Sequence, residues 1–176
     1  MIVDVLGLGS SLAIYKQEGL AVGVNDIWSR IKTDYVVCLD TKDRFTPERL
    51  RVIENCKPVK FYSIFPLKDK PQENDWSDRP DFEKIELQPY YPNYECQINT
   101  PQLPKSFCSP FVACAIAYKH FKATEIHLFG VDLISHPNLD SKQCEKIKLH
   151  FQNLKIALRQ NGCELVVFGD GILKDL

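Results

Sequence analysis

The sequence predicts an α/β protein with a three-layer Rossmann-like fold, in which helices cover both faces of a mostly parallel sheet of about six strands. Short apolar runs alternate with helix-like segments along the chain, which is the pattern of helices packed on a parallel sheet. Several of these runs, such as YVVCL and ELVVF, are apolar at nearly every position. Strands of this composition are typical of a sheet that is covered on both faces.

The expected strands are the apolar runs at Ile2–Leu6, Leu20–Val24, Tyr35–Leu39, Val59–Tyr62, Glu125–Phe129 and Glu164–Phe168. Most of them end in glycine or polar residues, as strands do where the chain turns toward the next helix. In a parallel sheet these polar residues meet at one edge, where open α/β sheets bind their ligands. The residues that follow the strands are therefore the candidates for a functional site.

Three segments are expected to be helices because each has a recognisable start or stop. Thr46–Cys56 opens with a threonine cap followed by a proline, and Ser109–Phe121 opens with a serine in the same position. In Ser141–Asn161 apolar residues recur every three or four positions, and Gly162 provides the stop. This helix is expected to pack one stripe on the sheet, formed by Ile147, Phe151, Leu154 and Leu158.

Length and composition indicate a single domain over residues 1–176, because 176 residues of which 44% are hydrophobic can bury a core. The net charge of -1 excludes the strong basic field that collects nucleic acid or an anionic membrane. No apolar run approaches the roughly 20 residues that a membrane-spanning helix needs. The seven cysteines contain no CxxC pair, so we expect reduced, core-filling thiols and a cytoplasmic location.

Residues 66–104 interrupt the alternation of strands and helices. Seven of the eleven prolines fall in this segment, together with Trp76 and three tyrosines. A long segment without periodicity that still carries aromatic residues is more typical of a functional loop than of disorder. We expect a lid or insertion over the site. The alternative is a structural arm that covers a sheet edge or a partner subunit, and the latter would make a homo-oligomer.

The turn after the first strand is the first candidate site. Gly7, Gly9, Ser10 and Ser11 follow this strand directly, and their backbone N–H groups, with the start of the next helix, are suited to hold a phosphate. Leu12 stands where a dinucleotide fingerprint has its third glycine, which points away from NAD. The alternative is a tight turn that binds no ligand.

Polar residues also follow the next two strands. Asn25 can donate and accept hydrogen bonds, which suits a ribose hydroxyl or a base edge, and Asp26 can accept from a hydroxyl. Asp40 closes the third strand and is suited to a metal-bridged phosphate or a substrate hydroxyl. The alternative for all three is the capping of a helix or turn. Ser109 is expected to cap its helix and to contact the phosphate or sugar of a ligand.

The run EIHLFGVDLISH places Asp132 and His136 just after a buried strand. An aspartate and a histidine in this position can act as general acid and base or hold a divalent cation. The alternative is an inert surface turn, because a proline and an asparagine follow the histidine. Of the other histidines, His127 is expected to be a core or sheet-face residue with its hydrogen bonds satisfied, the alternative being a ligand, and His120 and His150 are expected on helix surfaces.

Taken in order, the motifs LGLGSSL, AVGVN, YVVCLD, SPFVACAIAYKHF and IHLFGVDL with its following histidine resemble a group of Rossmann-type proteins. The group includes the archaeal hydroxymethyl-dihydropterin pyrophosphokinase and the Maf flagellin glycosyltransferase-like proteins, and its sheet is similar to that of bacterial sialyltransferases. The usual turn of the group is Gly-x-Gly-Pro-Ser-Leu. In this chain Ser10 replaces the proline, whereas Ser11 and Leu12 match.

The resemblance implies a nucleotide or nucleotide-sugar at the first turn, with Asn25 near the nucleoside and Asp132 and His136 near the reacting group. It favours a glycosyltransferase-like, nucleotide-dependent transferase, with Mg²⁺ or Mn²⁺ as the candidate metal. One alternative is phosphoryl transfer of the pyrophosphokinase type, for which Asp26, Asp40 and Asp132 would hold Mg²⁺. Another is a non-catalytic module that binds a small molecule or a partner chain.

Overall fold

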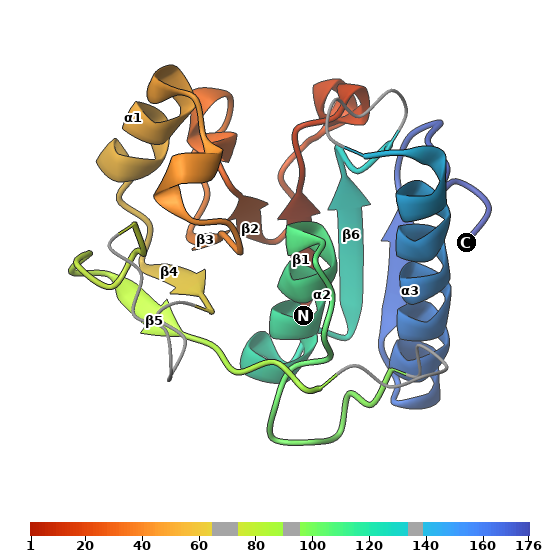
Figure 1. Ribbon diagram of the computed structural model, residues 1–176. Coiled ribbons are helices and arrows are strands. Elements are labelled where there is room, and N and C mark those ends of the chain that lie inside the picture. Colours follow the sequence, from red (N-terminus) through yellow and green to blue (C-terminus); the bar gives the residue numbers. More distant parts are fainter. Residues whose placement is uncertain (65–73, 90–95, 134–138) are drawn as a thin grey trace.

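One parallel sheet organises the computed structural model, which describes residues 1–64, 74–89, 96–133 and 139–176. In these residues seven strands follow the order β5-β4-β3-β2-β1-β6-β7, and every neighbouring pair is parallel (Figure 1). The strands are β1 (Ile2–Leu6), β2 (Leu20–Val24), β3 (Tyr35–Val37), β4 (Lys60–Ser63), β5 (Phe82–Lys84), β6 (Glu125–Phe129) and β7 (Glu164–Val167). Helices pack on this sheet, so the predicted Rossmann-like α/β fold is confirmed.

Each of the expected strands is present with small changes of its ends. β1, β2 and β6 have the expected bounds, β3 and β7 end slightly earlier, and β4 is shifted by one position. The sequence does not predict β5, because this strand is short, carries two charged residues and lies in the proline-rich segment. It forms the sheet edge beside β4. The lid hypothesis for residues 66–104 also involves residues 65–73 and 90–95, which lie outside the described residues.

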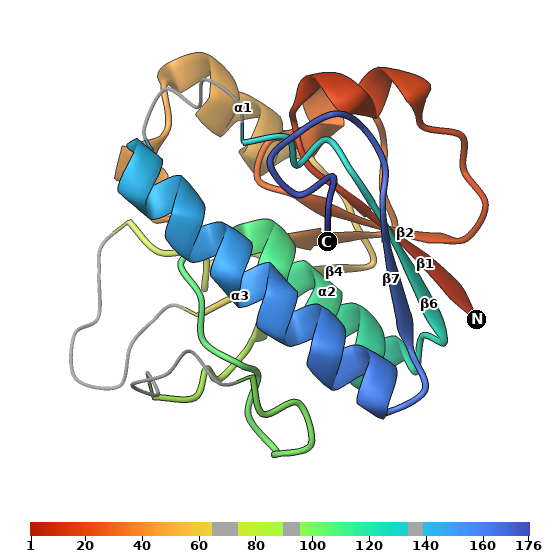
Figure 2. The ribbon, with the colours of Figure 1, turned by 90° about the vertical axis from the view of Figure 1, so that its right-hand side faces the viewer.

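The side on which the chain adds new strands to the sheet changes once, although all neighbouring strands are parallel. From β1 the chain adds β2 to β5 in one direction, and it then returns through α2 (Ser109–Phe121) to place β6 on the other side of β1. The next helix, α3 (Ser141–Gln160), leads to β7. Because parallel crossovers are right-handed, the reversal puts α2 and α3 on the face opposite the earlier connections. Figure 2 shows these two helices side by side.

The starts of α1 (Pro47–Asn55) and α2 differ in how well the sequence predicts them. The N-cap residue of α1 is Thr46, as predicted, although its side chain makes no capping hydrogen bond. The N-cap residue of α2 is Cys108, so the prediction that Ser109 caps this helix is wrong. The reason is conformational, since an N-cap needs an extended backbone and Cys108 has it. Ser109 is the first helical residue.

The start of α3 is a capping box that the sequence analysis did not identify. The carboxylate of Asp140 accepts from the backbone N–H of Gln143 at 2.8 Å, and the Gln143 side chain accepts from the backbone N–H of Asp140 at 2.9 Å. Two N–H groups that the helix itself cannot satisfy are thereby paired. The predicted apolar stripe is confirmed, because all four of its residues, Ile147, Phe151, Leu154 and Leu158, are buried.

Removing this cap is expected to weaken the fold measurably. The substitution Asp140→Ala should lower the free energy of unfolding in urea by about 1 kcal/mol, because a backbone N–H at the start of α3 loses its acceptor. The control is Asp175→Ala, at an exposed aspartate outside the helices, which should stay within about 0.5 kcal/mol of the wild type. Equal losses in the two variants would contradict the capping role of Asp140.

Two hydrophobic cores lie on the two faces of the sheet. The side chains of β1 show the division, because Val3 and Val5 belong to the core under α2 and α3, whereas Leu6 belongs to the core with α1 and Trp76. Trp76 is 0% exposed although it comes from the segment expected to be a lid or arm. All seven cysteines are free and five are buried, which confirms the expectation of core-filling thiols.

The described histidines occupy three different environments. His127 is buried in β6 and His120 is exposed on α2, as predicted. The prediction that His150 lies on a helix surface is wrong, because this side of α3 faces α2 and the residue is only 3% exposed. Its Nδ1 lies 3.1 Å from the hydroxyl of the buried Ser106. Burial lowers the pKa of His150, since a charged ring would lose its hydration.

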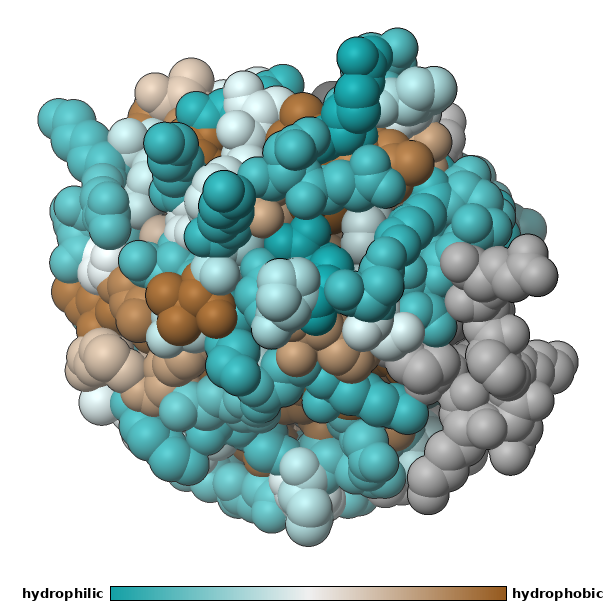
Figure 3. Space-filling model, turned by 90° about the vertical axis from the view of Figure 1, so that its left-hand side faces the viewer, coloured by the Kyte–Doolittle hydropathy of each residue, from teal (hydrophilic) through white to brown (hydrophobic). Residues whose placement is uncertain are grey.

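The face that carries the β5 edge of the sheet is mainly hydrophilic, with apolar groups in separate patches (Figure 3). Val59 is the large hydrophobic side chain with the greatest exposure among the described residues, at 63%. Separate exposed apolar residues of this kind are ordinary on protein surfaces. As the sequence analysis predicts for the chain, none of the described helices is both long and apolar enough to span a membrane.

Candidate functional site

The carboxyl ends of β1 and β6 meet where the sheet order reverses, which is the ligand-binding position of open α/β sheets. The two chain segments approach each other closely here. The N–H of Gly7 donates to the carbonyl of Phe129 at 2.8 Å, and the N–H of Gly9 donates to the carbonyl of Gly130 at 2.7 Å. A Cβ atom on Gly9 would lie 2.6 Å from a carboxylate oxygen of Asp132. Close approach of the two segments therefore explains the glycines of the first turn.

The carboxylate of Asp132 lies on the serine end of this turn. It accepts from the Ser10 hydroxyl at 2.8 Å, from the Ser11 N–H at 2.9 Å and from the Ser11 hydroxyl. The Ser11 hydroxyl in turn accepts from the N–H of Gly130 at 2.8 Å. Of the backbone donors that the sequence analysis assigns to a ligand phosphate, the Ser11 N–H bonds this carboxylate, and the Gly7 and Gly9 N–H groups bond backbone carbonyls. The structure therefore joins two parts of the predicted site through contacts within the protein.

The hydrogen bonds of Asp132 favour its charged form. Partial burial raises its pKa, but the hydrogen bonds from Ser11 and Ser10 outweigh this effect and hold the pKa below the ordinary value. A carboxylate in this state is a poor general acid at neutral pH. His136, its predicted partner, lies outside the described residues. The acid and base roles of Asp132 and His136 therefore stay predictions.

The segment after β7 covers Asp132, a feature that the sequence analysis missed. The N–H of Ile172 donates to the backbone carbonyl of Asp132 at 3.0 Å, and Gly169 lies against Ser11. The available signal is the pair of glycines in FGDG near the end of the sequence, since glycine often marks a place where two backbones approach closely. The reversal point is thus closed on one side by the chain itself.

A second group of predicted residues meets at the end of β2. Asn25 has a left-handed backbone (φ 52°) and its N–H donates to the carbonyl of Val37 at 3.1 Å. The hydroxyl of Ser109 donates to the side-chain oxygen of Asn25 at 3.4 Å. α2 has no acidic residue in its first turn and no side-chain cap. Asn25 therefore lies beside the uncapped, electropositive start of a helix of 13 residues.

Asp26 and Asp40 flank this group in different ways. Asp26 is buried, and its carboxylate accepts from Arg49 of α1 at 2.6 and 3.0 Å. It stands at the N-cap position of a 3₁₀ turn, but its side chain makes no capping bond there. Asp40 is an exposed residue in the connection that follows β3. Local desolvation raises the pKa of Asp40 above its ordinary value, and the positive charges of Arg44 and Arg49 offset only part of this effect. Sequence reasoning missed Arg49, because an ion pair between separate elements leaves no sequence pattern.

The structure does not assemble the carboxylates into a metal site. Across the described ranges, no group of three or more histidine, cysteine, aspartate or glutamate side chains is arranged to hold a metal ion. Asp26 is occupied by Arg49 and Asp132 by the serines. The set of Asp26, Asp40 and Asp132 expected for a phosphoryl transferase is therefore not brought together in this conformation.

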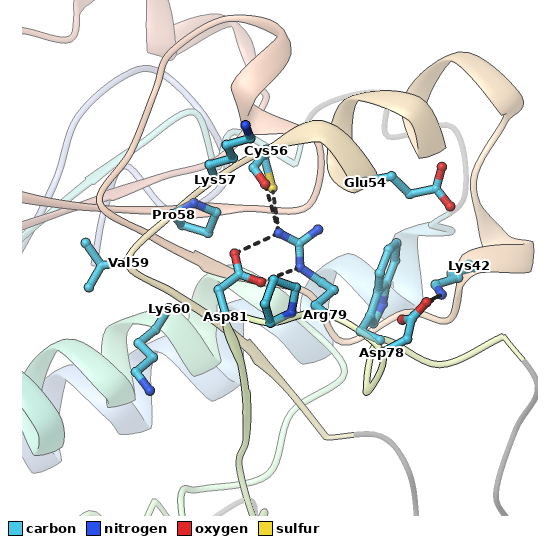
Figure 4. A pocket seen from close by; sticks show the side chains of 12 residues that line it. Lys42, Glu54, Cys56, Lys57, Pro58, Val59, Lys60, Asp78, Arg79 and Asp81 are labelled. Carbon is cyan, nitrogen blue, oxygen red and sulfur yellow. Dashed lines mark hydrogen bonds and ion pairs between the residues drawn. The ribbon is translucent and has the colours of Figure 1, made fainter.

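A pocket of about 650 Å³ lies elsewhere, between the end of α1 and the segment before β5 (Figure 4). Its central side chain is Arg79, which is paired with Asp81 at 2.8 Å. Lys42 at the rim is paired with Asp78 at 2.9 Å, and Lys57 extends away from the pocket centre in Figure 4. Because most of the charges are compensated within the protein, the lining selects no particular ligand.

Comparison with protein-family models, with curated proteins and with solved structures gives no match to this chain.

Proposed function

We propose that this protein binds a nucleotide or nucleotide-sugar at the carboxyl edge of its sheet and acts as a glycosyltransferase-like transferase. The observation that supports the proposal most is the contact between Asn25 and Ser109 at the uncapped start of α2. This contact lies beside the reversal point of a doubly wound parallel sheet, where such folds bind ligands.

The chemistry of this group suits the phosphate and ribose of a nucleotide. The N-terminal end of α2 has the positive end of the helix dipole, which favours a phosphate, and its backbone donors are the N–H groups of Ser109 and Phe111, because Pro110 has none. The amide of Asn25 can donate and accept at once, as a ribose hydroxyl or a base edge requires. Arg49 is held in place by its pair with Asp26, and this pair carries no net charge because the carboxylate compensates the guanidinium.

The transfer step would rely on positioning and on charge stabilisation at the leaving phosphate. Asp132 holds the first turn in place through Ser10 and Ser11, and His136 is the candidate base. Exposed Asp40 is the carboxylate available to a Mg²⁺ or Mn²⁺ ion that enters with the nucleotide. In this proposal the fold binds and orients the donor, and the residues after β6 act on the acceptor.

Thermal unfolding with CMP, UDP and GDP compounds and ATP, each with and without Mg²⁺ or Mn²⁺, tests the binding. A ligand at 100 times its dissociation constant should stabilise the wild type by about 2.7 kcal/mol. The substitutions Asn25→Gly, which tolerates the left-handed backbone, and Ser109→Ala should each weaken binding about tenfold by removing a hydrogen bond. Ser29→Ala, at an exposed serine, is the matched control and should bind like the wild type.

Three outcomes are decisive for the proposal. Stabilisation by no nucleotide would contradict binding altogether. Equal stabilisation of the wild type, Asn25→Gly and Ser109→Ala would place the ligand elsewhere on the molecule. Release of free nucleotide from a bound nucleotide-sugar, with the sugar passing to water or to an added hydroxyl acceptor, then tests the transfer by ion-exchange chromatography. Binding without release to either acceptor would leave a sensor or interaction module.

A further inference from the structure

A buried aspartate and a buried histidine lie beside each other on two neighbouring strands in the middle of the sheet. Asp4 of β1 and His127 of β6 are partners in register and are 0% and 5% exposed. Oδ1 of Asp4 and Nδ1 of His127 each have no hydrogen-bond partner among the described residues, and the two atoms lie 3.5 Å apart. Neither residue belongs to the candidate site, and buried polar atoms without partners need a physical explanation.

The other oxygen of Asp4 is fully engaged. It accepts from the Tyr15 hydroxyl at 3.2 Å and from the backbone N–H groups of Glu18 and Gly19, each at 3.1 Å. Burial and the nearby charge of Asp4 raise the pKa of Tyr15, so this phenol stays protonated and donates. Hydrogen bonds donated to a carboxyl oxygen favour the charged form of the group. A carboxylate buried this deeply needs a compensating positive charge.

The surroundings of the imidazole contain negative charge from several elements. Nε2 of His127 lies 2.7 Å from Glu125 of its own strand, and Nδ1 lies 3.6 Å from Glu18 of the β1–β2 connection. Phe168, the residue after β7, places its ring 5.2 Å from the imidazole, and Glu164 of β7 lies in register with Glu125. Among the described residues no lysine or arginine forms an ion pair with Asp4, Glu18 or Glu125. The imidazole is therefore the group placed to supply the positive charge.

We infer that His127 is a charged imidazolium in the folded protein and serves as a proton-operated anchor for the β1–β2 connection. A neutral ring that donates from Nε2 to Glu125 would turn the lone pair of Nδ1 toward Oδ1 of Asp4, so that two acceptors would oppose each other. A proton on Nδ1 removes this conflict and compensates the carboxylate that holds Tyr15, Glu18 and Gly19.

The anchor has a direct structural consequence for the first turn. The β1–β2 connection is held at its serine end by Asp132 and at its far end by Asp4. Without the imidazole proton, the second of these attachments would weaken while the first remains. The inference depends only on the geometry around Asp4, so it stands or falls independently of nucleotide binding.

Nuclear magnetic resonance of the ring nitrogens tests the charge state directly. In the wild-type protein at about pH 7, long-range ¹H–¹⁵N spectra should show both nitrogens of His127 protonated, with the signal assigned from its absence in His127→Gln. A neutral ring with one unprotonated nitrogen would overturn the inference. If the variant does not fold, selective ¹⁵N-histidine labelling of the wild type with assignment through the strand neighbours gives the same answer.

Hydrogen exchange of the Glu18 and Gly19 amides tests the anchor. At about pH 7, their protection in His127→Gln, after correction for intrinsic exchange rates and relative to the core amide of Leu128, should be about tenfold lower than in the wild type. His120→Gln, at an exposed helix position, should be protected like the wild type. Equal protection in the wild type and His127→Gln would overturn the anchor.

Discussion

The substitution Asp132→Ala is expected to lower the free energy of unfolding by about 3 kcal/mol. Its carboxylate receives two serine hydroxyls and one backbone N–H, and both it and Ser11 are buried. Removing the acceptor leaves the N–H and the hydroxyl of buried Ser11 without this partner, whereas exposed Ser10 can bond water. Each unpaired buried group costs about 1–3 kcal/mol. The small cavity that the substitution opens adds less than this. Urea unfolding followed by circular dichroism measures the change.

The control for this prediction is Asp170→Ala, whose side chain is 90% exposed and is paired with Lys174 at 3.0 Å. An exposed pair contributes about 0–1 kcal/mol, so this variant should unfold almost like the wild type. If Asp132→Ala were as stable as Asp170→Ala, the serine contacts would carry no stability. The carboxylate would then be free for chemistry, as the sequence analysis supposes.

The same contacts predict that the free energy of unfolding depends on pH in the acid range. The folded protein holds the pKa of Asp132 below its ordinary value, so ionised Asp132 stabilises the fold above the unfolded pKa of about 3.9, and this contribution is lost as the pH falls through the folded pKa. Asp132→Asn cannot titrate at this position. Its stability should therefore fall less steeply than that of the wild type below about pH 4, in unfolding titrations at matched salt.

The sheet could be predicted because a strand that is buried on both faces is a nearly continuous apolar run, which is visible in the local sequence. IVDVL and EIHLF need no distant information to be recognised as strands. β5 could not be predicted, because three residues with two charges gain their strand conformation only from pairing with β4. Segments that depend on a neighbour in space carry little local signal.

The candidate site could be predicted as a set of positions but not as a set of contacts. Polar residues after strands had to meet at one edge of a parallel sheet, and the contact of Ser11 with Asp132 shows one such meeting. Asn25 also follows a strand, but its partner Ser109 is the first residue of α2. The sequence does not show that Asp132 bonds the serines or that Arg49 bonds Asp26. These contacts depend on how elements distant in the sequence pack together. The positions follow from topology, whereas the partners follow from side-chain packing in three dimensions.

The substitution Arg79→Ala is expected to be the most destabilising at the β4–β5 edge, lowering the free energy of unfolding by about 3–5 kcal/mol. The guanidinium donates to Asp81 at 2.8 Å, and it also donates to the carbonyls of Ile53 and Cys56 at 2.7 and 2.9 Å. These carbonyls lie at the end of α1, where a helix leaves acceptors without partners. The side chain is only 9% exposed and lies over the ring of Phe61 at 4.3 Å.

Two further variants separate the causes of this loss. Arg79→Lys keeps the charge but not the planar fork that serves Asp81 and two carbonyls together, so it should recover only part of the stability. Arg51→Ala removes an arginine of α1 whose side chain is 71% exposed. This variant should change the free energy of unfolding by less than about 0.5 kcal/mol. Because Arg79 joins the end of α1 to the segment that leads into β5, amide exchange should accelerate in β5 before it does in β1. A loss spread evenly over the sheet would show that Arg79 does not act locally.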